Sequence, residues 1–216
     1  MYNLFERDTS KWVNLITLCY TYELMVDLGD GGPPDFIPQA PDISIEYTDW
    51  SELEPEREDN PSGPSFFKIN SENKVYPVVI KSLKHSGTLD KNEVTSFVNK
   101  CDIWGKLADH NNITDVLSYS GRPIPWLAIE YMDGGSLNRI IKRGRLPPKQ
   151  ALWVTYYICQ GLFYAHRHGV VHHNIKPTNI LFRTVENGWN VPKISDWGLG
   201  QMLIDEADNQ PQLSTR

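Results

Sequence analysis

The sequence predicts an α+β fold in two parts, in which strands and one helix come first and helix-rich sequence follows. Three observations support this order. Two apolar runs between residues 65 and 83 flank a turn-forming segment, residues 90–107 repeat apolar side chains every three or four positions, and a longer helical repeat covers residues 149–168. The break Asp133-Gly-Gly135 separates the two parts. With 216 residues, 40% of them hydrophobic, the chain can form one core or two small lobes.

Residues 1–28 are predicted to contain an amphipathic helix. Thr9 or Ser10 can cap its start, and the run that begins at Gly29 stops it. Apolar side chains recur there at helical spacing: Trp12, Leu15, Ile16, Cys19, Tyr22 and Val26. Because so aromatic a face is a liability in water, we expect it to dock, either on the same chain or on a partner.

Residues 29–50 are predicted to be a Pro-rich acidic linker or a loosely attached extended strap. Seven of the fifteen prolines lie between Gly29 and Pro64. The first lobe is then expected over residues 51–132, and the second over residues 133–216.

Within the first lobe, Ser65–Ile69 and Lys74–Leu83 read as a hairpin around the turn Asn70–Asn73. Two further short strands are expected at Val116–Tyr119 and Trp126–Tyr131. The predicted helix at Asp90–Leu107 presents one apolar stripe: Val94, Phe97, Cys101, Trp104 and Leu107. The helix predicted at Lys149–His168 in the second lobe presents another: Ala151, Val154, Ile158, Leu162 and Ala165.

Composition limits the class of partner. A net charge of −6 and a pI near 5.5 argue against nucleic acid or an anionic membrane as a general partner. Cys19, Cys101 and Cys159 form neither a metal-binding spacing nor a disulfide framework, which favours a cytoplasmic location. The most apolar stretch, Trp12–Tyr22, is too short to span a bilayer.

Several motifs stand in a fixed order. The run Val171-Val-His-His-Asn-Ile-Lys-Pro-Thr-Asn-Ile-Leu181 is followed by Asp196-Trp-Gly198, and is preceded by Val78-Val-Ile-Lys81 and Ile129-Glu-Tyr-Met-Asp-Gly-Gly-Ser-Leu137. Together they resemble the catalytic loop H-R-D-x-K-P-x-N, the D-F-G motif, the V-A-I-K strand and the inter-lobe hinge of eukaryotic-type protein kinases. The resemblance runs from about Ile43 to the C-terminus, and its details look closest to archaeal members.

The resemblance implies a protein-kinase-like two-lobe fold, with a β-rich N-lobe containing one helix and a partial helical C-lobe. It also implies ATP and Mg²⁺ as cofactors. Lys81 and Lys176 would place two cations beside the triphosphate, and the backbone at Glu130 and Met132 would meet adenine. The oxygen ligands that Mg²⁺ prefers would come from Asn179 and Asp196, while His172 and Trp197 are expected to be structural.

The main departure from the family pattern is Asn174, which stands where the family has the Asp that accepts the proton of the substrate hydroxyl. An amide can orient a hydroxyl but cannot take its proton near neutral pH. Loss of a positioned base typically costs roughly 10²–10⁴-fold in rate. His173 also replaces the Arg that pairs with a phosphorylated activation segment.

Two more parts depart from the pattern. The helix that should offer Lys81 an acidic partner reads Phe97-Val-Asn-Lys100, so a cation is expected to face a cation, and Asp102 lies about 200° around the helix. The loop that should cover the phosphates reads Glu58-Asp-Asn-Pro-Ser-Gly-Pro-Ser65. Its prolines lack donors and its two acids would repel a polyanion.

The chain stops at Arg216, within the expected activation segment, so the C-lobe is predicted to be incomplete. We expect much of the apolar face of the Lys149–His168 helix to be exposed unless a partner covers it. A nucleotide-binding pseudokinase with weak or no phosphotransfer is therefore favoured, with a protein partner or substrate. An active Ser/Thr kinase and an inactive truncated or split fragment stay open as alternatives.

Overall fold

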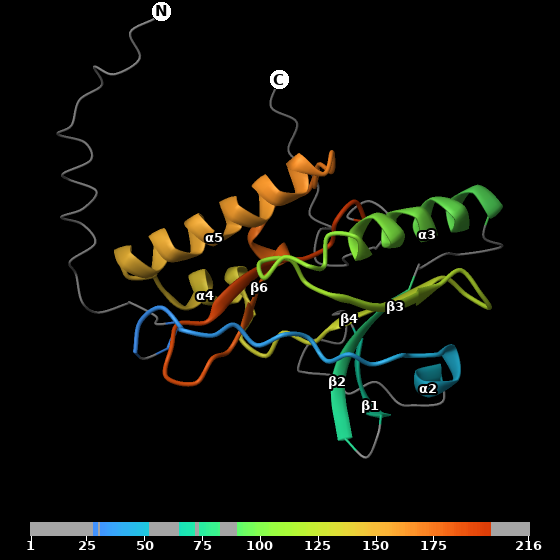
Figure 1. The fold of residues 1–216 in the computed structure, drawn as a ribbon, viewed down its shortest axis with the longest axis horizontal. Coiled ribbons are helices and arrows are strands. Elements are labelled where there is room, and N and C mark those ends of the chain that lie inside the picture. Colours follow the sequence, from blue (N-terminus) through green and yellow to red (C-terminus); the bar gives the residue numbers. More distant parts are fainter. Residues whose placement is uncertain (1–27, 30, 52–64, 72–73, 83–89, 200–216) are drawn as a thin grey trace, which may run out of the picture.

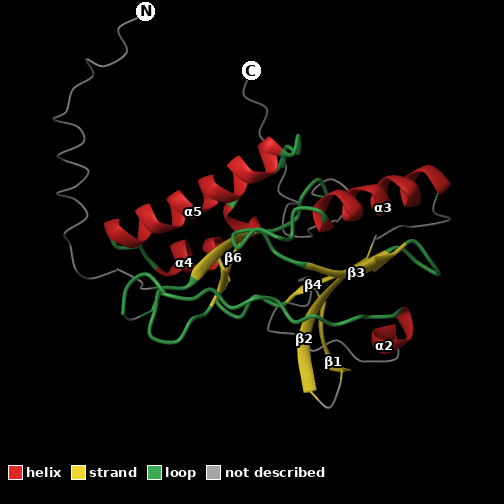
Figure 2. Ribbon diagram, in the orientation of Figure 1, coloured by secondary structure: helices red, strands yellow, loops and turns green. Residues whose placement is uncertain are grey.

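The computed structural model describes residues 28–29, 31–51, 65–71, 74–82 and 90–199. The predicted N-terminal helix, most of the proline-bearing loop and the segment after residue 199 lie outside these ranges. The elements are, in chain order, α2 (Tyr47–Ser51), β1 (Ser65–Ser71), β2 (Lys74–Ser82), α3 (Lys91–Gly105), β3 (Val116–Ser120), β4 (Trp126–Glu130), β5 (Gly135–Ser136), α4 (Leu137–Arg143), α5 (Pro148–Arg167), the 3₁₀ turn η2 (Pro177–Asn179), β6 (Ile180–Arg183) and β7 (Val191–Ile194) (Figures 1 and 2). The predicted α+β layout is confirmed.

The first lobe is an antiparallel sheet with strand order β1-β2-β4-β3. The predicted hairpin is confirmed, with pairing that runs from Ser65 opposite Ile80 to Ser71 opposite Lys74. The next pairing, between β2 and β4, places Lys81 opposite Leu127. Lys81 is therefore fixed near the end of a central strand.

Both faces of this sheet are covered, as β4 shows. Trp126 and Ala128 pack into one apolar cluster with the segment before α2, whereas Leu127 and Ile129 pack into another with α3. Because side chains alternate along a strand, cover on both faces buries every residue of β4. Figure 1 shows α3 and this segment on opposite sides of β3 and β4.

Residues 31–51 form a strap that packs more closely than a linker or a loosely attached segment would. Ile43, Ile45 and Trp50 are buried against the sheet. The Trp50 ring lies 5.7 Å from the rings of both Phe67 and Trp126. The strap packs closely because it carries apolar side chains between its prolines. These side chains bury the second face of the sheet, which would otherwise be exposed to water.

The second lobe contains α4, α5 and the antiparallel sheet β5-β6-β7. At the predicted Gly-Gly break, the backbone N–H of Gly134 donates to the carbonyl of Phe182 at 2.8 Å. A methyl group on Gly134 would lie 2.7 Å from Phe182 Cβ, so a side chain does not fit there. This close approach joins the inter-lobe segment to β6.

The expectation about the apolar stripe of α5 is wrong. Val154 and Ala165 are buried, and Ile158 and Leu162 pack against the same core. This stripe faces inward because α5 lies over β7 and supplies one wall of the core of the second lobe.

No helix in the described ranges is both long and apolar enough to cross a membrane.

Candidate functional site

The loop before β6 is held by a buried histidine. His172 is only 2% exposed, its Nε2 lies 2.8 Å from the carbonyl oxygen of Ser195, and its ring centre is 4.7 Å from that of Trp197. Its Nδ1 accepts a hydrogen bond from the backbone N–H of Asn174 at 3.2 Å. These two bonds require the neutral tautomer protonated on Nε2, and burial lowers the pKa of His172 accordingly.

Asn179 ties the same loop together. Its Nδ2 donates to the carbonyl of Asn174 at 3.0 Å, and its own carbonyl accepts from the backbone N–H of Ser195 at 2.9 Å. The amide oxygen accepts from the Thr178 hydroxyl at 3.4 Å. The backbone of Asn174 is thus fixed on both sides, by His172 and by Asn179.

Asp196 and Lys81 come together although they lie in different lobes. The Lys81 ammonium group forms an ion pair with Asp196 Oδ1, and both side chains are mostly buried. Asp196 has a positive φ of 66°, and the next residue, Trp197, is buried with its indole N–H bonded to the carbonyl of Ile194. This backbone turn aims the Asp196 carboxylate at the end of β2.

Helix α3 does not supply the carboxylate that pairs with Lys81. Asp102 bonds Lys106 at 2.5 Å and the Tyr119 hydroxyl at 3.2 Å, and the bond from Lys106 lowers its pKa. Lys100 lies beside the Asp196-Trp-Gly198 turn, since a methyl group on Gly198 would be 3.8 Å from Lys100 Cγ. The side-chain stem of Lys100 therefore lies next to this turn, while the expectation that Lys100 faces Lys81 stays a prediction.

The two predicted adenine-contacting residues are both buried. The Glu130 carboxylate is fully buried and is bonded by Lys193 at 2.5 Å and by Arg183. Only its backbone is left to meet a nucleotide, and its N–H already donates to the carbonyl of Asp115 at 3.1 Å. Met132 is 5% exposed, and its carbonyl accepts from Gly135 N–H at 3.2 Å.

Lys176, the remaining predicted cation, is half-buried, and its carbonyl accepts from Asn179 N–H at 2.9 Å.

The charged cluster around Glu130 was not predicted. The Lys193 ammonium group bonds Glu130 Oε1 and lies 3.4 Å from Asp115 Oδ2. Arg183 forms an ion pair with the other carboxylate oxygen of Glu130. Burial raises the pKa of Asp115 to about 6, against the opposing effect of Lys193. A lone lysine in the apolar run Val191–Ile194 is the signal that could have revealed the cluster, since a buried cation needs a counter-charge.

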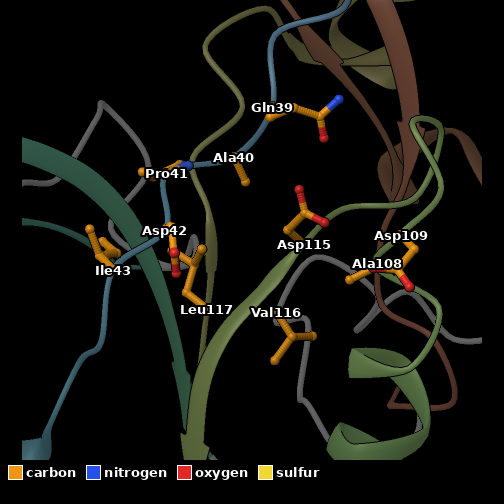
Figure 3. Close-up of a pocket in the computed structure, with 10 residues that line it drawn as sticks. All are labelled: Gln39, Ala40, Pro41, Asp42, Ile43, Ala108, Asp109, Asp115, Val116 and Leu117. Atoms are coloured by element: carbon orange, nitrogen blue, oxygen red, sulfur yellow. The ribbon is translucent and has the colours of Figure 1, made fainter.

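A cavity of about 360 Å³ lies between the strap and β3. It is lined on one side by the strap residues 39–43 and on the other by residues 108–109 and 115–117. Figure 3 shows the Asp115 carboxylate pointing toward the strap. None of the seven predicted site residues lines this cavity, so it is separate from the Lys81–Asp196 region.

The residues present fit a magnesium nucleotide. The amide oxygen of Asn179 and the carboxylate of Asp196 are hard oxygen donors on two segments, before β6 and after β7, that the bond from Ser195 N–H to the Asn179 carbonyl joins. Within the described ranges, no group of three or more His, Cys, Asp or Glu residues lies close enough to hold a metal alone. Mg²⁺ bound with a nucleotide does not require one, because phosphates and water complete its shell.

Comparison with known proteins agrees with this geometry. The chain is 33% identical over 89 residues to the serine/threonine-protein kinase PknB of Mycobacterium leprae, which covers 41% of this chain and 14% of that protein. It is 32% identical over 112 residues to PknJ of Mycobacterium tuberculosis, covering 50% and 18%. The chain thus spans less than a fifth of the length of these relatives. A likeness to archaeal members stays a prediction. The family model of the protein kinase domain matches residues 63–216, and the chain therefore belongs to the protein kinase domain family.

Proposed function

We propose that this chain is a pseudokinase that binds Mg²⁺-ATP and transfers phosphate weakly or not at all. The observation that carries the proposal is Asn174. Its backbone is held by His172 and Asn179 within an ordered loop, so an amide stands at the position where the family has its proton acceptor. Binding groups are kept while the group that takes the proton is replaced.

Nucleotide binding is supported by the Lys81–Asp196 pair and by Asn179. Members of this family generally use ATP and Mg²⁺. In the proposed complex, Lys81 bonds the phosphates, and Asp196 and Asn179 hold the metal. Lys81 must then exchange its bond to Asp196 for bonds to phosphate oxygens. Lys176 would add a second cation on the side of the transferred group.

Weak transfer is supported by two further features. Lys100 adds positive charge beside the Asp196-Trp-Gly198 turn, where active kinases have an acidic partner for the strand lysine. The carboxylate that does contact Lys81 comes from Asp196, which an active site uses for the metal. Both features favour a site that binds the nucleotide but does not position its phosphate for transfer.

An active Ser/Thr kinase is the second candidate. The relatives named as serine/threonine-protein kinases and the retained Lys81, Lys176, Asn179 and Asp196 favour it. An inactive truncated or split kinase fragment is the third.

The test is the melting temperature of the chain with and without millimolar Mg²⁺-ATP. We expect ATP to raise it, because a ligand that binds only the folded state stabilises that state. Asp196→Asn should abolish the rise, whereas Asp102→Asn, which changes an acid that pairs with Lys106, should keep it. An unchanged melting curve for the unmodified chain would contradict nucleotide binding. Autophosphorylation that disappears in Lys81→Met would instead favour the active kinase.

A further inference from the structure

The strap, residues 31–51, crosses from one lobe to the other. Its first residues lie against the turn between β6 and β7, and its later residues cover the sheet of the first lobe up to α2. Figure 1 shows this path, in which the blue segment runs from the β6–β7 turn to α2. The strap is therefore a connection between the lobes in addition to the inter-lobe segment, residues 131–134.

The contact of the strap with the second lobe is made backbone to backbone. The carbonyl of Gly32 accepts a hydrogen bond from the backbone N–H of Trp189 at 2.6 Å. A methyl group on Gly31 would lie 2.0 Å from the carbonyl oxygen of Asn187, so only glycine fits there. This end of the strap is thus held against the β6–β7 turn by shape as well as by a hydrogen bond.

The chain just before the strap is fixed to the same lobe. Leu28 is 1% exposed and belongs to the apolar cluster that contains Val154 and Ala165 of α5. Its backbone N–H donates to Gln150 Oε1 at 2.9 Å, and its carbonyl accepts from Asn190 N–H at 2.9 Å. The strap therefore starts from a point that is anchored in the core of the second lobe.

The other end of the strap is held by the first lobe. Ile43, Ile45 and Trp50 are buried in one apolar cluster with residues of β1, β2 and β4. The carbonyl of Ile45 also accepts a hydrogen bond from the hydroxyl of Ser118 on β3 at 2.9 Å. This end is thus tied to the sheet by apolar burial and by a hydrogen bond.

The span between these two contacts is stiff. Proline fixes φ, and proline-rich segments behave as extended, semi-rigid spacers. Residues 33–42 contain no glycine and four prolines: Pro33, Pro34, Pro38 and Pro41. Within this span, Gln39 Nε2 donates to Asn111 Oδ1 at 3.1 Å, which adds a contact with the loop between α3 and β3. A stiff segment held at both ends passes the position of one lobe on to the other.

We propose that the strap braces the two lobes, so that it sets their separation and keeps them from opening freely in the absence of any ligand. Lys81 belongs to the first lobe and Asp196 to the second, so a fixed separation also holds this ion pair together. A strap that only covered the sheet would need the contacts near α2 alone, and the close approach of Gly31 to Asn187 would have no role. The brace is a property of the fold and does not depend on nucleotide binding.

The separation of the lobes can be measured between two spin labels in the full chain, without nucleotide. The labels are attached at Val75→Cys on β2 and Leu152→Cys on α5, two exposed positions. Cys19→Ser and Cys159→Ser prevent labelling elsewhere, and Cys101 stays unlabelled because it is fully buried. We expect one narrow distribution of the distance between the labels.

Lengthening the strap without changing either contact tests the brace. Six residues of alternating glycine and serine, inserted between Phe36 and Ile37, add up to about 20 Å of slack at a point where the Phe36 side chain is exposed. We expect this chain to give a broader distribution with a longer mean distance. The same insertion between Pro123 and Ile124, in the exposed loop between β3 and β4, is the control and should leave the distribution narrow. A lengthened strap with the same distribution as the control overturns the proposal.

A pair of neighbouring glycines provides a second test, which decides the question if the lengthened chain does not fold. Gly31 and Gly32 both have positive φ, 91° and 94°, so alanine is strained at either position, but only at Gly31 does its methyl group meet another atom within 4 Å. Gly31→Ala should therefore loosen the contact with Asn187 and broaden the distance distribution, whereas Gly32→Ala should keep it narrow. Identical distributions in the two variants overturn the proposal.

Discussion

Lys81 of β2 forms an ion pair with Asp196, although the two residues are 115 positions apart and belong to different lobes. Each has another partner in the family's nucleotide complex: the lysine bonds phosphate and the aspartate holds Mg²⁺. The pair holds both groups in place in this structure. If the proposed nucleotide complex forms, binding would exchange this charged contact for contacts to phosphate and metal.

The pair should be measurable as a coupling energy. Lys81→Met and Asp196→Asn each leave a mostly buried charged group without this partner, so each should lower the free energy of unfolding. The double variant should lose less than the sum of the two, by about 1 kcal/mol, as is typical of residues in direct contact. Urea unfolding of the four chains gives the value. Strict additivity would show that the two groups do not interact in solution.

Restoring the family's acid at position 174 should help phosphate transfer only slightly. Asn174→Asp is expected to raise the rate by less than the roughly 10²–10⁴-fold that a positioned base supplies, because Lys100 still lies beside Gly198. Adding Lys100→Glu should raise the rate further. Transfer of labelled phosphate to a generic protein substrate measures both, with Asn187→Asp as a control outside the catalytic loop. Full activity in Asn174→Asp alone would show that Lys100 is not a cause of weak phosphate transfer.

The buried cluster predicts a pH effect of defined sign. Burial raises the pKa of Asp115 from 3.8 to about 6, so between these values the folded chain holds a proton that the unfolded chain has released. As the pH rises through that window, the unmodified chain loses stability through this group. Asp115→Asn lacks the effect, so its stability should rise relative to the unmodified chain and then level off above about pH 6.

This difference is obtained from urea unfolding at a series of pH values from 4 to 7. Lys193, Glu130 and Arg183 face the same cluster and are present in both chains, so their contributions to stability largely cancel in the difference. A difference that stays constant across the series would show that Asp115 titrates near its ordinary value in the folded chain.

The strap should contribute to stability through Trp50. Trp50→Ala removes a ring packed against Phe67 and Trp126, and should cost about 3 kcal/mol of unfolding free energy. Phe36→Ala is the matched control in the same strap, because Phe36 is 70% exposed, and it should change the stability by less than about 0.5 kcal/mol. Equally small changes in unfolding free energy in both variants would show that the strap is only loosely attached.

The sequence by itself predicted the local elements of this protein. The hairpin, α3 and α5 follow from apolar periodicity, which depends only on the spacing of neighbouring residues. The loop around Asn174 was recognisable because its motif keeps the residues that bond one another over short distances, such as His172 and Asn179. The same motif showed which residue departs from the family pattern.

Only the tertiary structure decided which distant groups meet. Periodicity identified an apolar face on α5, but not that this face lies inward on β7 while other apolar side chains of the helix stay exposed. It could not show that Glu130 is neutralised by Lys193, or that Lys81 pairs with Asp196. Burial and ion pairing between residues far apart depend on how the two lobes and the strap pack together, and no local pattern specifies that packing.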